Sequence, residues 1–217
     1  RRKLSNEFVD YFVFPKLSCL AKKGYGNSKY LQNYDEFYDH ISSHHITYVD
    51  GEPNAGKSTL LRYIYIRLAE KAIPIIWDAA NERMSAKRLI KHLFDAQYGD
   101  QPALYERYEQ SLTENRYLIV DNWDVLSGHD KENYLEQLKD QFGAIILGRN
   151  ILFVDGEVNV EESVREALLS ESGESNILRI QPFFRAKRKE LVRNVCMVSG
   201  ALNESDIEQV NNAINSL

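Results

Sequence analysis

The sequence is poor in the features that would set it apart from an ordinary globular protein. Its two cysteines, Cys19 and Cys196, are too few for a disulfide framework and lack metal-ligand spacing, which favours a reducing, intracellular environment. No uninterrupted apolar run approaches the roughly 18 residues that a membrane-spanning helix needs. We therefore expect a cytoplasmic protein without membrane association. The chain begins with Arg-Arg-Lys instead of Met, and no apolar signal-peptide segment follows, so we expect a piece of a longer protein.

An excess of basic residues is also absent. Lys and Arg number 27 against 32 Asp and Glu, which gives a formal net charge of −5. This balance argues against a protein whose whole surface coats nucleic acid, although it leaves room for a local basic patch. The 217 residues, 43% hydrophobic and 27% charged, fit one large α/β domain, or one domain and the start of another.

What the sequence does contain is an alternation of short apolar runs with amphipathic stretches. The runs are rich in β-branched residues and apolar at consecutive positions, as expected for strands buried on both faces. They cover residues 46–50, 73–78, 117–121, 144–148 and 176–180. Helices are predicted at 34–41, 57–71, 85–98, 102–113, 131–141 and 160–170, and two more after Pro182. This alternation predicts an α/β fold with a parallel sheet flanked by helices.

The stretch GEPNAGKST follows the first apolar run and matches the phosphate-loop pattern G-x-x-x-x-G-K-[ST] at every fixed position. Its two glycines allow the backbone to bend round an anion, and the N–H groups of the loop and the next helical turn can point at phosphate oxygens. Lys57 is predicted to reach the β- and γ-phosphates, and Ser58 to ligate Mg²⁺. We predict that ATP binds through Gly51, Asn54, Ala55, Gly56, Lys57, Ser58 and Thr59.

A second signal is the acidic end of the run RYLIVDNWD. An apolar strand that ends in a carboxylate is what a phosphate-loop site uses to hold the magnesium shell, so Asp121 is predicted to act there with Ser58. Asn122 follows, where many P-loop ATPases carry a second carboxylate, and an amide cannot act as a base. Asp124 is our candidate for that catalytic duty, with helix capping as an equal alternative.

One arginine and one basic helix are further candidates for the site. Arg149 follows the run AIILG, and the carboxyl ends of parallel strands line the ligand crevice, so we expect Arg149 to read the γ-phosphate. A basic helix comes after QPFF, with Arg185, Lys187, Arg188, Lys189 and Arg193. Its default interpretation is a solvated face. The alternatives are a lid arginine that faces the phosphates, for which we name Arg188, and a nucleic-acid patch.

The order GEPNAGKST, LIVDNWD, IILGRN and IQPFFRAKRKELV resembles the nucleotide-binding module of STAND-class P-loop ATPases, which include NLR-type immune receptors and bacterial anti-phage sensors. The resemblance implies a P-loop NTPase fold with a parallel five-stranded sheet in the order 5-1-4-3-2, and Arg149 as a γ-phosphate sensor. It also implies a connector at 1–30, an ATPase core at 31–182 and the start of a helical lid at 183–217. Asn122 departs from the acid that is common in the family, which predicts slow hydrolysis without loss of binding.

These features predict an ATP- and Mg²⁺-binding signalling switch that controls the conformation and oligomerisation of a larger, defence-related multidomain protein. The resemblance further implies homo-oligomers formed through the ATPase module, effector and sensor domains in the same longer chain, and a phage or other protein ligand.

Three other functions remain open on the sequence. One is an AAA-like ATPase or loader that acts on DNA, which the basic helix suggests. Another is a small-molecule P-loop kinase, although no acceptor motif is visible, and a third is a degenerate loop with a structural role. A GTPase is disfavoured because no N-K-x-D guanine-reading motif occurs. For the adenine base, the sequence offers only Tyr30, Leu31 and the helix after Pro182 as guesses.

Overall fold

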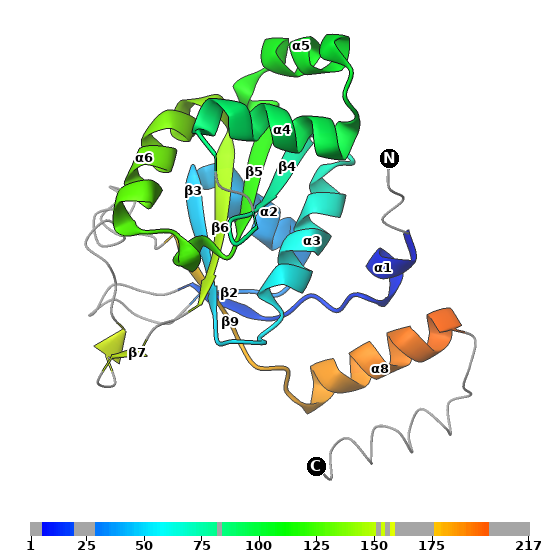
Figure 1. The fold of residues 1–217 in the computed structure, drawn as a ribbon. Helices are drawn as coiled ribbons and strands as arrows, with labels where there is room; N and C mark the ends of the chain where they lie inside the picture. Colours follow the sequence, from blue (N-terminus) through cyan, green and yellow to red (C-terminus); the bar gives the residue numbers. More distant parts are fainter. Residues whose placement is uncertain are drawn as a thin grey trace.

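The molecule is organised around a mostly parallel β-sheet, shown in the computed structural model of Figure 1. The structure describes residues 6–19, 29–81, 84–150, 153–154, 157–158 and 176–199. In this part of the chain, the main sheet has seven strands in the order β2-β1-β9-β3-β6-β5-β4. The strands are β1 Leu17–Cys19, β2 Tyr30–Leu31, β3 Ile46–Gly51, β4 Ile73–Asp78, β5 Arg116–Asp121, β6 Ala144–Asn150 and β9 Ile177–Ile180.

The predicted five-stranded sheet is wrong in its extent. The five parallel strands lie in the order β9-β3-β6-β5-β4, which is 5-1-4-3-2 when they are numbered among themselves along the chain. β1 then pairs antiparallel with β9, and β2 with β1. These strands have three and two residues, too few to show the alternation by which a strand is recognised in a sequence. The segment predicted as a connector thus supplies strand β1 to the sheet.

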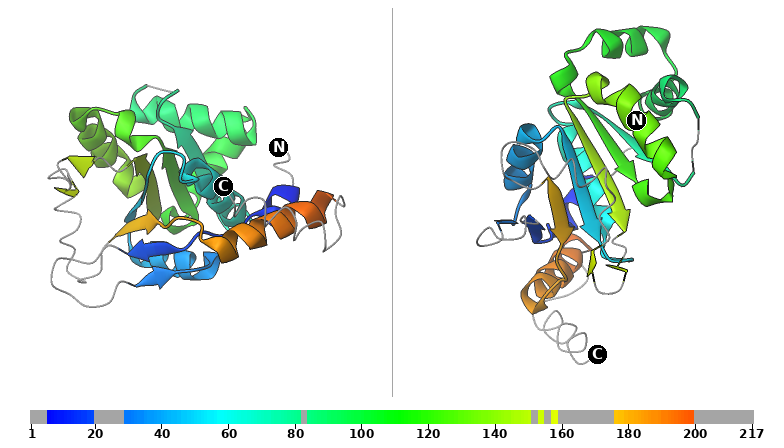
Figure 2. Two further views of the ribbon diagram at one scale, coloured as in Figure 1. Left: turned by 90° about the horizontal axis from the view of Figure 1, so that it is seen from below. Right: turned by 90° about the vertical axis from the view of Figure 1, so that its left-hand side faces the viewer.

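Helices cover both faces of the sheet (Figures 1 and 2). The α-helices are α1 Asn6–Tyr11, α2 Tyr34–Ser43, α3 Lys57–Leu68, α4 Ala86–Tyr98, α5 Pro102–Gln110, α6 Gly128–Leu138 and α8 Arg185–Ser199. Short 3₁₀ turns cover Thr113–Asn115, Trp123–Val125 and Lys139–Gln141, and a separate hairpin pairs β7 Phe153–Val154 with β8 Glu157–Val158. No described helix combines the length and the apolarity that crossing a membrane would require.

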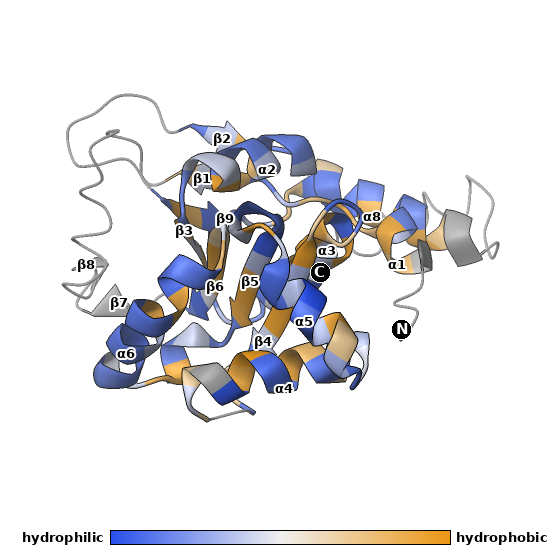
Figure 3. Ribbon diagram, turned by 90° about the horizontal axis from the view of Figure 1, so that it is seen from above, coloured by the Kyte–Doolittle hydropathy of each residue, from blue (hydrophilic) through white to orange (hydrophobic). Residues whose placement is uncertain are grey.

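The hydrophobic core has two parts, one on each face of the sheet. On one face, α2 and α3 pack on the sheet through residues such as Phe37 and Leu61, which are fully buried. On the other face, α4 and α6 pack around Trp77, whose ring contacts the ring of Tyr134. Neighbouring residues of a central strand therefore serve opposite faces, and in Figure 3 the strands between the helices carry much of the colour of hydrophobic residues. Burial of the strands on both faces explains why they are apolar at consecutive positions.

The helix boundaries differ from the predicted ones by a few residues. The helix predicted at 131–141 is α6, which begins at Gly128 because Ser127 is its N-cap and accepts a hydrogen bond from the N–H of Asp130. The first basic helix after Pro182 is present as α8. The helix predicted at 160–170 and the second helix of the predicted lid lie outside the described residues. The domain division at residues 30 and 182 stays a prediction.

Candidate nucleotide-binding site

The loop at residues 51–58 joins the end of β3 to the first turn of α3 and has a sharply bent backbone. Asn54 and Gly56 both adopt the left-handed conformation, with φ of 64° and 87°. A Cβ atom on Gly51 would lie 3.2 Å from the Cβ of Ala55. The loop therefore folds back tightly on its root, the end of β3 at Gly51. Gly56 is also the N-cap of α3, which leaves the first N–H groups of the helix without a side-chain cap. This arrangement is suited to an anion, because those donors and the helix dipole face the same space.

Lys57 lies over this loop and is surrounded by carboxylates. Its Nζ donates to the carbonyl oxygens of Gly51 and Glu52, at 2.9 Å and 2.7 Å. Burial lowers the pKa of Lys57 below its ordinary value of 10.5, while the negative charges of three aspartates oppose that shift. In decreasing order of effect these are Asp124, Asp121 and Asp50. The three residues come from different strands or loops, so the fold gathers them round the lysine.

Asp121 ends β5 beside the first turns of α3. One of its carboxylate oxygens, Oδ1, accepts the N–H of Asn122 at 3.0 Å. A Cβ atom on Gly148 would lie 2.6 Å from Leu61 of α3 and 3.5 Å from that same Oδ1, so helix, strand and carboxylate meet closely at this point. Ser58 is exposed in the first turn of α3. The donor set, one carboxylate and one hydroxyl, fits Mg²⁺, which keeps waters and phosphate oxygens as its other ligands.

No larger metal cluster competes with that interpretation in the described part of the chain. There, no group of three or more His, Cys, Asp or Glu side chains could hold a metal ion. A bound Mg²⁺ would neutralise charge on the phosphates, and Ser58 and Asp121 are the side chains that would hold it. These assignments stay predictions.

Asp124 does not cap the helix that follows it. Ser127 has that role, and both carboxylate oxygens of Asp124 accept from Asn150 at the end of β6. The backbone N–H of Asn150 lies 3.2 Å from Oδ1, and its side-chain amide lies 2.9 Å from Oδ2. The contact ties the turn after β5 to β6 and keeps the carboxylate close to Lys57. The carboxylate of Asp124, for which we predicted a catalytic duty, therefore already accepts hydrogen bonds from two donors of Asn150.

Arg149 is held side-on by an aspartate that the sequence analysis overlooked. Its Nε donates to Oδ1 of Asp50 at 2.6 Å, and its Nη2 donates to Oδ2 at 3.1 Å. The two residues are register partners on β6 and β3, and their side chains are 14% and 1% exposed. The guanidinium also lies 4.9 Å from the ring centroid of Tyr48. Among the described residues, the hydrogen bonds of the Arg149 guanidinium engage Nε and Nη2 and leave Nη1 without an acceptor.

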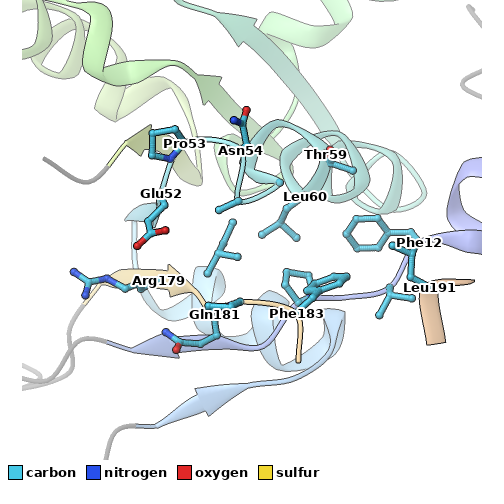
Figure 4. Close-up of a pocket in the computed structure, with 16 residues that line it drawn as sticks. Phe12, Glu52, Pro53, Asn54, Thr59, Leu60, Arg179, Gln181, Phe183 and Leu191 are labelled. Atoms are coloured by element: carbon cyan, nitrogen blue, oxygen red, sulfur yellow. The ribbon is translucent and has the colours of Figure 1, made fainter. Parts of the chain in front are cut away.

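A cavity of about 650 Å³ opens directly beside the loop. The loop forms one wall, and the segments before β1 and after β9 form the other (Figure 4). The lining residues are Phe12, Val13, Pro15, Glu52, Pro53, Asn54, Ala55, Gly56, Thr59, Leu60, Arg179, Ile180, Gln181, Pro182, Phe183 and Leu191. The wall away from the loop is mainly apolar and aromatic. A volume of this size and a mixture of apolar and polar lining are typical of a site for a small organic ligand.

The residues named as guesses for an adenine pocket differ in their position relative to this cavity. Tyr30 and Leu31 do not line it, whereas Leu191 of α8 does. Arg188 is exposed on α8 and is not among the lining residues, and its contact with the phosphates stays a prediction. The aromatic stretch FVDYFVFP supplies Phe12 and Pro15, which the sequence analysis placed only in a connector.

Asp50 and Asp78 share the sequence signal that singles out Asp121. Three of the predicted strands end in aspartate, in the runs ITYVD, IPIIWD and YLIVD. Only the last, with Asp121, was interpreted as functional. Asp50 and Asp78 end the other two and lie at the same edge of the sheet, because the strands are parallel.

The parallel sheet, the loop between β3 and α3 and the carboxylate at the end of β5 give the chain the fold of a P-loop NTPase. No protein-family model and no curated protein sequence matches it at a significant level.

Comparison with solved structures finds distant similarity. Domain III of the replication initiation protein DnaA from Thermotoga maritima has a TM-score of 0.48 at 14% identity, covering 81% of this chain and 71% of that one. A chain of Drosophila ORC bound to DNA has a TM-score of 0.47 at 16% identity, covering 79% and 49%. A chain of the HORMA:CdnC:Trip13 complex of E. coli MS115-1 has a TM-score of 0.42 at 11% identity, covering 79% and 60%.

Proposed function

We propose that the chain is an ATP-binding module with Mg²⁺ as its cofactor. The observation that carries the proposal is that the phosphate loop itself, from Glu52 to Gly56, forms a wall of the cavity of about 650 Å³. A triphosphate on the loop N–H groups would then place its nucleoside in the cavity, against the aromatic and apolar side chains of Phe12 and Phe183. The lack of a guanine-reading motif favours adenine.

Within this module we assign separate duties to the charged residues. Lys57 would neutralise the β- and γ-phosphates, and Ser58 and Asp121 would hold the ion. Arg149 would read the γ-phosphate with Nη1 while Asp50 fixes the guanidinium. Asp50 immediately precedes Gly51 and pairs with Arg149 of β6. Loss of the γ-phosphate would therefore alter contacts both at the root of the loop and on β6.

The role that we propose for ATP binding is a switch that turns over slowly and controls oligomerisation of a larger, defence-related protein. Two observations support it over a fuel role. Asn122 is an amide where a base would speed hydrolysis, and Asp124 is shared with Asn150. The resemblance to STAND-class ATPases supports the same choice.

Calorimetric titration with Mg²⁺ and either ATP or GTP tests the binding proposal. We expect ATP to bind more tightly than GTP, and Lys57→Ala to weaken ATP binding by about 10- to 100-fold, through the loss of charge-assisted contacts. Lys71→Ala removes an exposed lysine beyond the other end of α3 and serves as the matched control. Failure of the wild-type protein to bind either nucleotide would contradict the proposal.

The switch role needs a separate measurement, because binding alone does not distinguish a switch from a motor. We expect the full-length protein to assemble in an ATP-dependent manner under activating conditions, and Lys57→Ala to stay unassembled. Light scattering measures the assembly. Equal assembly of the wild type and the Lys57→Ala variant would rule the switch out.

A DNA-dependent ATPase is the second candidate, and α8 is the observation that favours it. The helix exposes four basic side chains, Arg185, Arg188, Lys189 and Arg193. Duplex DNA would then stimulate hydrolysis, and its affinity would fall steeply with salt. An ATPase rate that does not respond to DNA at low ionic strength would remove this candidate.

A further inference from the structure

The amide that replaces the usual second carboxylate is fixed by a neighbouring strand. Asn122 follows Asp121 at the end of β5 and has a left-handed backbone, with φ of 56°. Its Nδ2 donates to Oδ1 of Asp78 at 2.8 Å. Asp78 ends β4, which lies next to β5 in the sheet (Figure 1), and it is the register partner of Asp121. The polar side chains at the ends of two strands therefore form one unit.

Asp78 can hold the amide in one orientation only. Its carboxylate also accepts the N–H of Ala80 at 3.1 Å and the side-chain amide of Asn81 at 2.5 Å. An ionised carboxylate has acceptors and no donor, so Asn122 must present its nitrogen to Asp78. The carbonyl oxygen Oδ1 of Asn122 is then the acceptor that remains. Among the described residues, no donor contacts it.

We propose that Asn122 Oδ1 orients the water that attacks the γ-phosphate, and that Asp78 is the residue that positions Asn122 for this task. The inference rests on the proposed ATPase function and names its missing water-binding group. Amide side chains position the attacking water in some P-loop NTPases, so the chemistry has precedent. Asn122 is placed for it, since it directly follows Asp121, one of the carboxylates whose charge acts on Lys57.

The proton balance accounts for slow turnover. The water oxygen forms a bond to the γ-phosphorus, and the bond from that phosphorus to the β–γ bridging oxygen breaks. ADP leaves with the electron pair. Because an amide cannot take a proton, one proton of the water passes to an oxygen of the γ-phosphate. The γ-phosphate then leaves as dihydrogen phosphate. Asn122 thus lowers the entropic part of the barrier without supplying a base.

Single-turnover ATP hydrolysis by variants of the full-length protein tests the inference, with calorimetric ATP binding measured in parallel. Asn122→Gly removes the amide and keeps the left-handed backbone. We expect its hydrolysis rate to fall about tenfold or more while its ATP affinity stays within about twofold of wild type. Asp78→Ala should lower the rate in the same way, because the side-chain amide of Asn122 can then rotate out of its fixed orientation. The double variant should be no slower than Asn122→Gly alone.

Exchanging the two side chains, Asp78→Asn with Asn122→Asp, keeps the hydrogen bond with donor and acceptor reversed. It places a carboxylate after Asp121, so we expect hydrolysis about tenfold faster than wild type or more. Asp140→Ala, an exposed carboxylate before β6 at the opposite edge of the sheet, is the control that should leave the rate unchanged. Thermal unfolding gives a readout without nucleotide. The sum of the Tm losses of Asn122→Gly and Asp78→Ala should exceed the Tm loss of the double variant.

The outcomes separate this inference from the function on which it rests. A wild-type protein that binds ATP, together with an Asn122→Gly variant that hydrolyses it equally fast, would overturn the water-positioning role and leave the ATP-binding proposal intact. ATP binding without hydrolysis by the wild type would have the same meaning. A wild-type protein that does not bind ATP would overturn both.

Discussion

The carboxyl edge of the sheet carries two cross-strand polar contacts that differ in charge and burial. Asp50 and Arg149 join β3 to β6 as a compensated ion pair whose aspartate is 1% exposed. Asp78 and Asn122 join β4 to β5 as a carboxylate and an amide, and both side chains are only partly buried. The first contact brings a charge into the interior, where it must be paired. The second keeps a negative charge near solvent, where it accepts a hydrogen bond that fixes the amide of Asn122.

This difference assigns the two contacts different duties. A buried pair is costly to break, so Asp50 and Arg149 are suited to hold the root of the loop against β6. A partly exposed hydrogen bond stabilises the fold little, so Asp78 and Asn122 are free to serve orientation. Four measurements break or sharpen this comparison, from the largest expected effect to the smallest.

Removing the buried carboxylate should have the largest effect on stability. Asp50→Ala leaves the guanidinium of Arg149 inside the protein without its partner, which should lower the free energy of unfolding by about 3–5 kcal/mol. Urea denaturation measures the loss. The double variant Asp50→Ala with Arg149→Met should regain most of it, because no charge is then buried alone. A loss below about 1 kcal/mol for the single variant would contradict the buried-pair interpretation.

Removing the carboxylate of the second contact should cost much less. Asp78→Ala deletes acceptors for three donors, all near solvent, and should lower the free energy of unfolding by about 1 kcal/mol. The same urea experiment measures it, with Asp140→Ala expected within about 0.5 kcal/mol of wild type. If Asp78→Ala were as damaging as Asp50→Ala, the two contacts would not differ in kind.

The left-handed asparagine of the loop gives a matched pair of variants. Asn54→Ala should cost about 1 kcal/mol, because a Cβ without a polar group is disfavoured at φ of 64°, while Asn54→Gly should be nearly neutral. Thermal unfolding of both variants measures the difference. Equal stability would show that the loop changes its conformation to accommodate alanine.

Lys57 should give the smallest effect, with the opposite sign. Burial lowers the pKa of Lys57 in the folded state, so the unfolded chain holds that proton more tightly and the charged lysine costs stability at neutral pH. Lys57→Met should therefore unfold at a slightly higher temperature than wild type near neutral pH. The gain is small, at most about 0.5 kcal/mol, because the side chain is partly exposed and screened by solvent.

The pH dependence of that gain follows from the same shift. As the pH rises through the lowered pKa of Lys57 towards 10.5, wild type loses the charge in the folded state and becomes relatively more stable, so the advantage of methionine shrinks. Thermal unfolding of both proteins in a pH series measures it. A variant that is less stable than wild type at neutral pH would show that the contacts of Nζ with Gly51 and Glu52 outweigh the burial of charge.

Much of the local structure could be predicted, because its signals are local. Apolar runs gave the five parallel strands within a few residues, and the phosphate loop is a contiguous stretch whose bend depends on its own residues. Boundaries were weaker where a cap decides them, as at Ser127. The extent of the sheet was missed, since β1 forms only because the edge of β9 offers backbone partners.

The candidate site could be predicted only where its signals are local in the sequence. Lys57 and Asp121 follow from a motif and a strand end. Asp50 was missed because its importance depends on Arg149, which is 99 residues away in the chain. Asp78 depends in the same way on Asn122, 44 residues away. Arg188, named as a lid arginine that faces the phosphates, is exposed on α8 and does not line the cavity, so that role stays a prediction.

The sequence by itself determined an α/β chain with a phosphate loop between its first parallel strand and the next helix, because periodicity and loop chemistry act between near neighbours. The tertiary structure alone decided which aspartate pairs with which partner, and that Phe12, Phe183 and Leu191 close a cavity against the loop. Those contacts depend on strand order and register, which bring distant residues to one edge of the sheet. Long-range packing, and no local preference, sets that arrangement.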